Sequence, residues 1–368
     1  MGNRLVNEAL HIDMARGGGR LVAFGEAMIR SMPDASGNIR ETPGGAEWNV
    51  GIATARLGRD ASWVSTVPAA SEQWKLIREE SENAGLDISD LQISTGDGKI
   101  GRYVVDPIEK NVQYQRLDSA FANLDRGGYD WHRYLDGARW LVTSGITPLL
   151  GGGPKSAWSA ALTFAEMEGV LNVFDMNHRP ALGTLEQLWG EMISRMRQFH
   201  VVVTSPDTLD GIARIEGWRE PRNFVDRIEI MRKIRDLTLL PHLCCCFKEP
   251  TSQGQTTDNL PSNLPNEPPA SGNISQFRWS AVAHSFGVDD TRDTMILHNP
   301  TEPLGSGDAW LAGYLDGLTE FGNKPSSPKL AARRADLLAA LSQSTFGDAS
   351  QVTRSMLAAA EQHRDSAD

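Results

Sequence analysis

The stretch EPLGSGDAWLAGYLDGL, residues 302–318, joins a glycine-rich turn to an apolar helical run. The first turn of a helix presents unpaired backbone N–H groups together with partial positive charge, so an anion can be held there. Glycines let a phosphate approach the backbone closely, and Asp308 is placed to take a proton from a hydroxyl that attacks this phosphate. The alternative interpretation is an ordinary aspartate cap after a glycine turn.

Short apolar runs recur upstream of this turn. They are RLVAFG (20–25), WVSTV (63–67), WLVTSGI (140–146), LNVFDM (171–176) and HVVVTS (200–205), with amphipathic stretches at about 70–85, 155–169, 185–198 and 222–236. Strands that alternate with helices predict an α/β fold with a parallel, doubly wound sheet and helices on both faces. Ligands of such sheets bind at the carboxyl ends of the strands.

Two alternating segments, 27–43 and 99–117, predict β-hairpins that form a small β lid beside the main sheet. Residues 249–275 carry five prolines and no Lys or Arg, which predicts a disordered low-complexity loop. We expect a flexible leader over 1–19 and one large domain over 20–368. The tail of the chain predicts two helices.

Composition narrows the class of partner. The formal net charge is −11, which argues against nucleic acid or an anionic membrane as partner, because binding phosphates at scale needs a basic face. No stretch approaches the roughly 20 apolar residues that span a bilayer. The three cysteines are adjacent, at 244–246, with neither disulfide nor zinc spacing, which suits a reducing cytoplasm. The N-terminus has no apolar run of the signal-peptide type.

Four separated motifs, in order, carry a family resemblance: GGAEWNVG (44–51), SGITPL (144–149), DMNHRPAL (175–182) and GSGD (305–308). Together they resemble the PfkB/ribokinase family of sugar kinases, and the first three are most similar to its 2-keto-3-deoxygluconate kinase branch. The resemblance runs from about residue 20 to 350. It implies a ribokinase-like three-layer αβα sandwich with a mostly parallel central sheet and a small β lid.

The resemblance also implies an ATP-dependent kinase that uses Mg²⁺. Asp308 would be the catalytic base, and the backbone amides of Gly305, Ser306 and Gly307 would form an anion hole for the transferring phosphoryl group. Phosphoryl transfer requires the same groups: a positioned hydroxyl, a base, and dipoles directed at the phosphoryl oxygens.

For the sugar, the resemblance implies a pocket lined by Gly45 and Asn49, two arginines that grip a sugar-acid carboxylate, and two tyrosines as hydroxyl partners. The arginines are Arg116 and Arg179, and the tyrosines are Tyr103 and Tyr114. A guanidinium can make two charge-assisted bonds to a carboxylate, which favours an acid substrate. The alternatives are that Asn49 is a helix residue without a partner and that both arginines are surface residues paired with nearby acids.

Asp175 and Asn177 have two equal interpretations. They lie at the end of a predicted strand, where they could bind the water around Mg²⁺ or merely cap the following loop.

The nucleotide side departs from the family pattern. The resemblance places Ser205, Lys248, Gly305, Gly307 and Asp336 near ATP, and Asp207 and Glu302 near the metal. An Asn-x-x-Glu motif is expected where the chain reads SPDT (205–208), and a Lys-x-Gly-x-x-Gly stretch where Lys248 is followed by Glu249 and Pro250. A Gly-x-Asp-x-x-Gly segment is replaced by AASEQW (69–74), and Asp336 stands where Asn is expected.

Three functions therefore stay open. The first is ATP-dependent phosphorylation of a small sugar acid, with 2-keto-3-deoxygluconate as the acceptor that the resemblance implies. The second is a neutral-sugar kinase such as a fructokinase, and the third is a non-catalytic sugar-acid-binding or assembly subunit. The retained Asp308 favours catalysis, and the lid favours a homodimer, since it would otherwise leave an exposed sheet edge.

Overall fold

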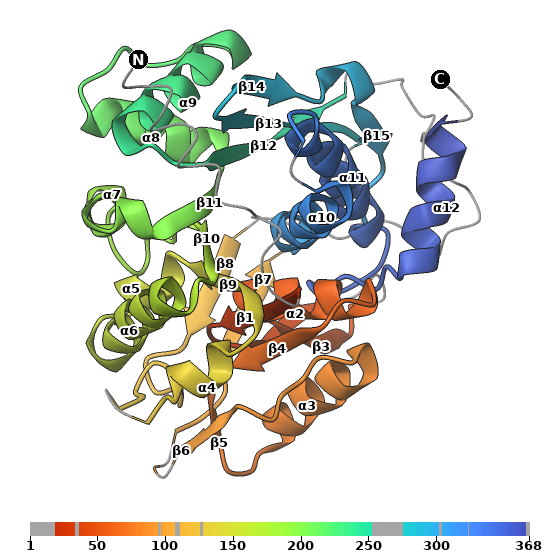
Figure 1. Cartoon of the computed structure of the whole chain (residues 1–368). Helices are drawn as coiled ribbons and strands as arrows, with labels where there is room; N and C mark the ends of the chain where they lie inside the picture. The colour runs from red at the N-terminus through yellow and green to blue at the C-terminus, as the bar shows by residue number, and fades with distance from the viewer. Residues whose placement is uncertain are drawn as a thin grey trace.

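The computed structural model describes residues 19–33, 37–94, 96, 98–106, 111–125, 128–251, 275–301, 304–322 and 324–365. The predicted leader and most of the predicted 249–275 loop lie outside these ranges. Within them, a large sheet is covered by helices on both faces, and a second, smaller sheet lies beside it (Figure 1).

The large sheet has the strand order β14-β13-β12-β11-β10-β9-β1-β4, with β15 also paired to β13. All pairs from β4 to β12 are parallel, and those of β13 are antiparallel. The strands are β1 (Arg20–Phe24), β4 (Ala61–Val64), β9 (Ala138–Ser144), β10 (Leu171–Asp175), β11 (Phe199–Thr204), β12 (His242–Pro250), β13 (Gln276–His284), β14 (Gly287–Asp290) and β15 (Ile296–His298). The mostly parallel sheet predicted from the apolar runs is confirmed.

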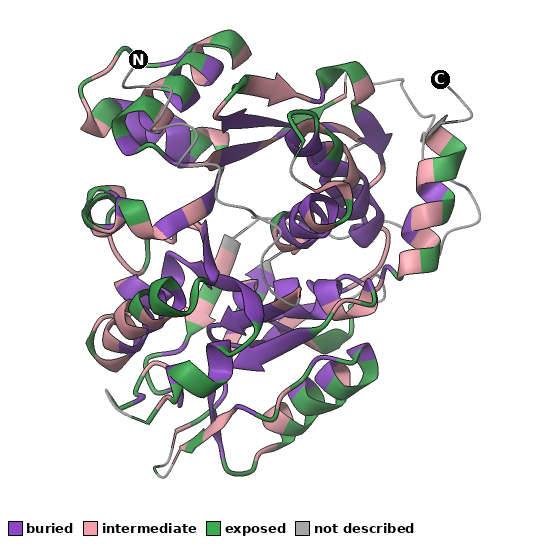
Figure 2. Cartoon of the chain, in the orientation of Figure 1, coloured by how far each residue is buried: buried purple, intermediate pink, exposed green. Residues whose placement is uncertain are grey.

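Alternation within the strands explains the two helical layers. In β1, Leu21 and Ala23 belong to one buried cluster, whereas Val22 and Phe24 belong to the other. Successive side chains of a strand point to opposite faces, so a strand that is apolar throughout needs cover on both sides. Figure 2 shows the resulting buried sheet between helices with exposed outer faces.

The first face is covered by α2 (Ala46–Arg56), α3 (Glu72–Ala84), α10 (Ser306–Phe321) and α11 (Ser327–Ser342), with α12 (Arg354–Asp365) outside α11. The second face is covered by α4 (Trp131–Leu135), α5 (Ile146–Leu149), α6 (Gly152–Glu168), α7 (Leu185–Ser194), α8 (Pro206–Ile215) and α9 (Phe224–Thr238). Two short 3₁₀ turns, η1 (Met196–Gln198) and η2 (Arg292–Thr294), complete the described helices. The helix predicted over 185–198 is therefore divided, since α7 ends at Ser194.

The two predicted hairpins form one four-stranded sheet, which we call the lid. Its order is β3-β2-β7-β8, with β2 (Met28–Pro33), β3 (Ile39–Gly44), β7 (Gly101–Asp106) and β8 (Asn111–Gln115). The two hairpins join through a parallel pairing of β2 with β7. The predicted β lid is confirmed.

Two boundaries differ from the predictions. The run at 63–67 is not one strand: β4 ends at Val64, and β5 (Thr66–Pro68) turns away to pair with β6 (Gln92–Ser94). The predicted loop 249–275 begins too early, because β12 continues to Pro250, which pairs with Gln276 of β13. Proline is tolerated at the end of a strand, so composition alone could not mark this boundary.

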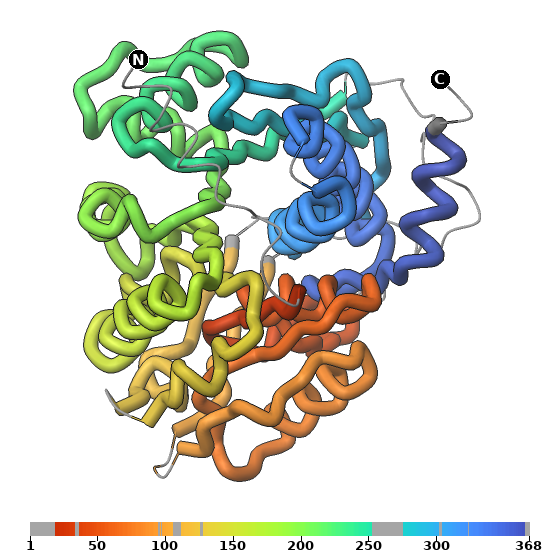
Figure 3. The backbone as a smooth tube through the Cα atoms, viewed as in Figure 1, coloured from red at the N-terminus to blue at the C-terminus, as the bar shows by residue number. Residues whose placement is uncertain are grey.

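Helices α2 and α10 pack together although about 250 residues separate them in the chain. Figure 3 shows the early and late segments side by side along the sheet. This packing brings the GGAEWNVG and GSGD motifs to one place. None of the described helices is both long and apolar enough to cross a bilayer.

Candidate active site

The GSGD turn is held in a backbone shape that only glycine allows. Gly305 precedes α10 with φ of +73°, and a Cβ there would lie 1.9 Å from the carbonyl oxygen of Asp348. L-residues avoid this φ region, and no Cβ contact is that short. The helix that follows is buried along most of its length, so its first-turn N–H groups are fixed in direction.

Asp308 lies in the first turn of α10 and contacts α2. Its Oδ2 accepts a hydrogen bond of 2.6 Å from Nδ2 of Asn49, a buried side chain. Burial, followed by the charge of Asp175, raises the pKa of Asp308 well above its ordinary value, while the Asn49 bond lowers it. The cap position is occupied by Gly305, so the alternative of a capping aspartate does not hold, and Asn49 is not without a partner.

A cavity of about 330 Å³ opens in front of this turn, at the carboxyl ends of β10 and β11 and beside β12. Its lining residues are Asp175, Asn177, His178, Arg179, Val203, Thr204, Ser205, Thr208, Cys246, Lys248, Arg278, Leu304, Gly305, Ser306, Gly307 and Asp308. Of the sequence-predicted residues, it collects the GSGD turn, Arg179, Ser205 and Lys248.

The loop after β10 supplies Asp175, Asn177 and Arg179. The carboxylate of Asp175 accepts bonds from the backbone N–H and the Nδ2 of Asn177, at 3.2 and 2.9 Å. These bonds accompany the left-handed backbone of Asn177, with φ of +36°. Burial raises the pKa of Asp175 to about 6, and Arg179 opposes this rise. Asp175 therefore caps the loop and also faces the cavity, so both of its interpretations fit the geometry.

Arg116 is buried rather than on the surface. Its Nε lies 3.5 Å from Oε2 of Glu26, and Nη2 lies 2.8 Å from the sulfur of Met28. It does not line the cavity with Arg179. Burial raises the pKa of the neighbouring Glu47 to about 7, an effect to which the charge of Asp175 adds and which Arg116 opposes. The charge of Arg116 thus stabilises the ionised forms of two buried acids, Glu26 and Glu47.

The two tyrosines lie in the lid. The Tyr103 hydroxyl donates to Asp348, whose Oδ1 also accepts from Nη1 of Arg30 at 2.9 Å. The Tyr114 ring lies 5.8 Å from that of Tyr103 and 5.1 Å from the guanidinium of Arg116. Tyr103 therefore acts on the GSGD turn through Asp348, because the backbone of Asp348 abuts that turn.

Close packing against Glu26 explains why glycine occupies position 45. A Cβ at Gly45 would lie 2.2 Å from the carbonyl oxygen of Glu26, and the Gly45 N–H donates to Oδ1 of Asn49 at 3.3 Å. The residue thus supports the side chain that contacts Asp308.

Of the residues predicted to lie near the nucleotide, Lys248 and Ser205 line the cavity, whereas Asp336 does not. Lys248 is exposed as a residue, but its Nζ donates to the hydroxyl of buried Ser306 at 2.7 Å. Ser205 lines the cavity and caps α8 by accepting from the N–H of Thr208 at 3.3 Å. Both residues line the cavity, and their contact with ATP stays a prediction.

Asp336 is placed differently. It is 1% exposed and does not line the cavity, and its carboxylate accepts bonds from Thr291 (2.6 Å), Trp310 (2.9 Å) and Ser280 (3.1 Å). Its position does not support a direct nucleotide contact, because β13 and α10 enclose it.

The two residues predicted to lie near the metal, Asp207 and Glu302, do not form a metal-ligand cluster in the described part of the chain. Asp207 is exposed on α8 outside the cavity lining, and Glu302 lies outside the described residues. Across the part of the chain that the structure describes, no three His, Cys, Asp or Glu side chains gather as a metal site.

Sequence reasoning missed two residues of this region, Arg278 and Asp348. Arg278 is a charged residue inside the apolar strand QFRWSAVAH (276–284), and this contrast is the signal that could have found it. Asp348 had no comparable signal, because only the packing places it against the GSGD turn.

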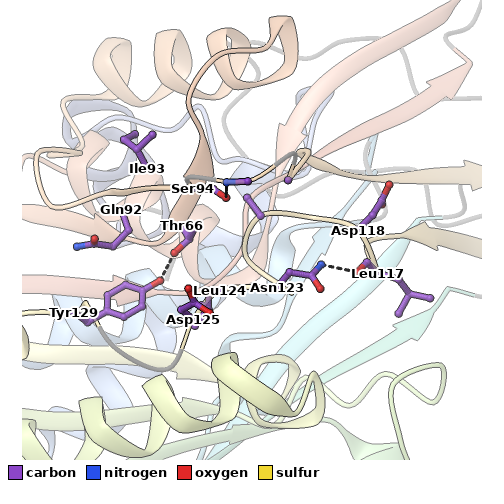
Figure 4. A pocket seen from close by; sticks show the side chains of 13 residues that line it. Thr66, Gln92, Ile93, Ser94, Leu117, Asp118, Asn123, Leu124, Asp125 and Tyr129 are labelled. Atoms are coloured by element: carbon purple, nitrogen blue, oxygen red, sulfur yellow. Dashed lines mark hydrogen bonds between the residues drawn. The ribbon is translucent and has the colours of Figure 1, made fainter.

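A second cavity, of about 560 Å³, lies away from these residues, between β5, β6, residues 117–125 and Tyr129 (Figure 4). Its polar groups bind one another: Thr66 and Tyr129 hydroxyls lie 2.6 Å apart, and Nδ2 of Asn123 donates to the carbonyl of Leu117 at 2.7 Å. The cavity at the GSGD turn is the candidate active site, because it collects the residues of the GSGD and DMNHRPAL motifs.

The sheet order, the lid and the cavity at the start of α10 define a ribokinase-like fold. Solved structures agree. The 2-dehydro-3-deoxygluconokinase of Thermotoga maritima superposes with a TM-score of 0.78 at 23% identity, covering 93% of this chain and 98% of that one. A PfkB family carbohydrate kinase of Listeria grayi gives 0.75 at 20% identity, covering 94% and 100%. A fructokinase of Vibrio cholerae with bound fructose, ADP and potassium ion gives 0.71 at 17%, covering 94% and 98%.

Curated relatives are sugar kinases as well. A 2-dehydro-3-deoxygalactonokinase of Haloferax volcanii is 28% identical over 209 residues, which cover 54% of this chain and 64% of that relative. A fructokinase of Klebsiella pneumoniae is 22% identical over 330 residues, covering 83% and 86%. No protein-family model matches the chain. The resemblance to the PfkB carbohydrate kinases is confirmed by these neighbours, and they are consistent with its 2-keto-3-deoxygluconate kinase branch.

Proposed function

We propose that this protein is a sugar kinase that transfers the γ-phosphoryl group of ATP to a hydroxyl of a small sugar acid, 2-keto-3-deoxygluconate in the first instance. The observation that carries the proposal is the contact between Asp308 and Asn49. It joins the start of α10 to α2 at a cavity that also collects Arg179 and Lys248. A carboxylate, a helix N-terminus and cations facing one cavity are the parts that phosphoryl transfer needs.

In the proposed reaction Asp308 accepts the proton of the acceptor hydroxyl, whose oxygen then bonds to the γ-phosphorus of ATP. The bond from this phosphorus to the β,γ-bridging oxygen breaks, and ADP leaves. The N–H groups of Gly305, Ser306 and Gly307 stabilise the charge on the transferring oxygens. The raised pKa of Asp308 suits a base, because it brings the carboxyl nearer to the working pH.

Mg²⁺ would be held mainly by the phosphates and water, as it commonly is in kinases. Asp175 and Asp308 are the carboxylates that line the cavity and could bind this water. The ion would neutralise phosphate charge when bound. A contact of Asp207 with the metal stays a prediction, since this residue lies outside the cavity lining, and Glu302 lies outside the described residues.

Arg179 supports an acid substrate, because its guanidinium lies at the cavity and a neutral sugar offers no carboxylate to it. Arg116 would act less directly, through the buried acids that it balances. Gly45, Tyr103 and Tyr114 would shape the sugar side between the lid and α2. The fructokinase relatives keep a neutral sugar as the second candidate acceptor.

The test is a coupled ADP-release assay with Mg-ATP, comparing 2-keto-3-deoxygluconate with fructose. We expect turnover with the acid, loss of most turnover in Asp308→Asn, and little change in Glu320→Gln, an exposed acid near the end of the same helix. Turnover with fructose alone would favour the neutral-sugar kinase. No ADP release with either acceptor, alongside sugar-acid binding by calorimetry, would contradict the kinase and favour the binding subunit.

A homodimer through the lid is part of the proposal. Ile39 on β3 is 66% exposed and Val104 on β7 is 44% exposed, which fits a lid face that a second copy covers. Sedimentation of the wild type and Ile39→Asp tests it, since a dimer through this face should dissociate in the variant.

A further inference from the structure

Arg278 is a charged residue without an ion-pair partner at the floor of the cavity. It lies in β13 directly across from Lys248 of β12, and both residues line the cavity. Its side chain is fully buried, at 0% exposure. Nη2 donates to the side-chain oxygen of Gln343 at 3.0 Å, whereas Nε and Nη1 have no hydrogen-bond partner. Among the described residues no carboxylate forms an ion pair with either cation, although the charge of Asp336 acts on Arg278 and that of Asp308 acts on Lys248.

Two cations in this arrangement cost free energy. A buried charge needs a partner of opposite sign, and like charges directly opposite on neighbouring strands destabilise a sheet. The effect on neighbours is visible: loss of surrounding water, followed by the charge of Arg278, lowers the pKa of Lys248, and the same two causes lower that of His298. An anion bound at the cavity would offset this cost.

The anion would bind near Nζ of Lys248, at the N-terminus of α10. The Nζ of Lys248 reaches Ser306 in the first turn of α10, so the cations and the helix N-terminus face the same end of the cavity. The two carboxylates that line the cavity, Asp308 and Asp175, accept hydrogen bonds from Asn49 and Asn177. The charge of Asp308 also acts on Lys248, so the cation end adjoins the group assigned to the acceptor hydroxyl.

We propose that Arg278 is a phosphate-site cation that, together with Lys248, holds the terminal phosphates of a nucleoside triphosphate. The pair takes the place of a glycine-rich phosphate loop, which the segment after Lys248 cannot form in the same way because Pro250 lacks a backbone donor. The inference rests on the proposed function for the identity of the anion. Its electrostatic part holds for any polyphosphate.

Isothermal titration of the full-length protein with inorganic tripolyphosphate, ATP and adenosine tests this role. We expect Arg278→Met to weaken binding of tripolyphosphate and ATP by about tenfold or more, the loss of one charge-assisted contact, and to leave adenosine unchanged. Arg278→Lys should recover part of the loss, because it keeps the charge.

Thermal unfolding separates this role from a structural one. Arg30 is the matched control, since it is also 0% exposed but pairs with Asp348. In the absence of an anion, Arg30→Met should lower Tm, because the buried Asp348 carboxylate loses its ion-pair partner. Arg278→Met should leave Tm unchanged or raise it, because it removes a buried cation that has no such partner. Arg278→Gln serves as a second neutral variant if Arg278→Met does not fold.

The outcomes are distinct. A folded neutral variant that binds tripolyphosphate as the wild type does would overturn the inference, as would a wild type that binds neither anion, or the failure of both neutral variants to fold. Turnover with an unchanged KM for ATP in Arg278→Met would overturn it while the kinase stands. Anion binding that depends on Arg278, without turnover on any acceptor, would support it while the kinase proposal fails.

Discussion

Replacing Asn49 with alanine should move the pH dependence of the proposed reaction in a defined direction. In the wild type, Nδ2 of Asn49 donates to Oδ2 of Asp308 at 2.6 Å, and this bond lowers the pKa of a carboxyl that burial and Asp175 raise. Without the donor the ionised form of Asp308 loses stabilisation, so its pKa rises. The acid limb of kcat/KM should then move to higher pH, because the base must be ionised to accept a proton.

The size of the shift follows from the kind of bond. A hydrogen bond to a charged group contributes about 1.5 to 3 kcal/mol, and about 1.36 kcal/mol corresponds to one pKa unit. Asp308 is half-buried at the cavity, so water can replace part of the lost bond. We therefore expect an upward shift of about one pH unit, at the lower end of this range.

The assay is kcat/KM for the sugar acid at saturating Mg-ATP, measured from about pH 5 to about pH 9. Thr54→Ala is the control, since Thr54 is another buried polar residue of α2 that lies away from the cavity. The control should keep the wild-type profile. Both variants should be checked for folding, because Asn49 also accepts the Gly45 N–H.

A result that refutes this reasoning is an Asn49→Ala profile whose acid limb stays in place or moves to lower pH while turnover continues. The group that titrates would then not be an Asp308 carboxylate stabilised by Asn49, and another base would be needed.

Three further outcomes are expected. Gly305→Ala should abolish turnover and destabilise the fold by about 3 kcal/mol or more in chemical denaturation, since its Cβ would lie 1.9 Å from the Asp348 carbonyl; wild-type stability would contradict the close approach of the two backbones. Arg179→Met should raise KM for the sugar acid about tenfold or more and leave the KM for ATP unchanged, since only the acid offers it a carboxylate; equal effects on both substrates would speak against this role. Asp316→Ala should destabilise the protein by about 2 to 3 kcal/mol at neutral pH, because three arginines donate to this carboxylate and some of them are partly exposed. Burial raises the pKa of Asp316, but Arg354 and Arg59 lower it more, so the net pKa lies below its ordinary value. The stabilisation by Asp316 is therefore present above that ordinary value, and the difference from the wild type in urea titrations should shrink as pH falls through the lowered pKa.

The elements that local pattern controls could be predicted. The apolar run RLVAFG predicted a buried strand and the alternation in the two lid segments predicted hairpins, and the GSGD motif begins α10, with Gly305 as its cap. Boundaries were less accurate, as at Val64 and Pro250, because strand ends depend on which neighbour is available for pairing.

Within the site, residue types indicated a candidate base beside an anion-binding turn, and the family resemblance added the expectation of a cation for a phosphate and an arginine for an acid. What only the tertiary structure decided is which of these meet. Asn49 contacts Asp308 because α2 packs on α10. The backbone of Asp348 contacts that of Gly305, and Arg116 lies beside Glu26. Arg278 lies across from Lys248 on the neighbouring strand. The physical reason is that these contacts join segments up to 259 residues apart. The crossovers and registers of the sheet set them, and local periodicity in the sequence does not record these.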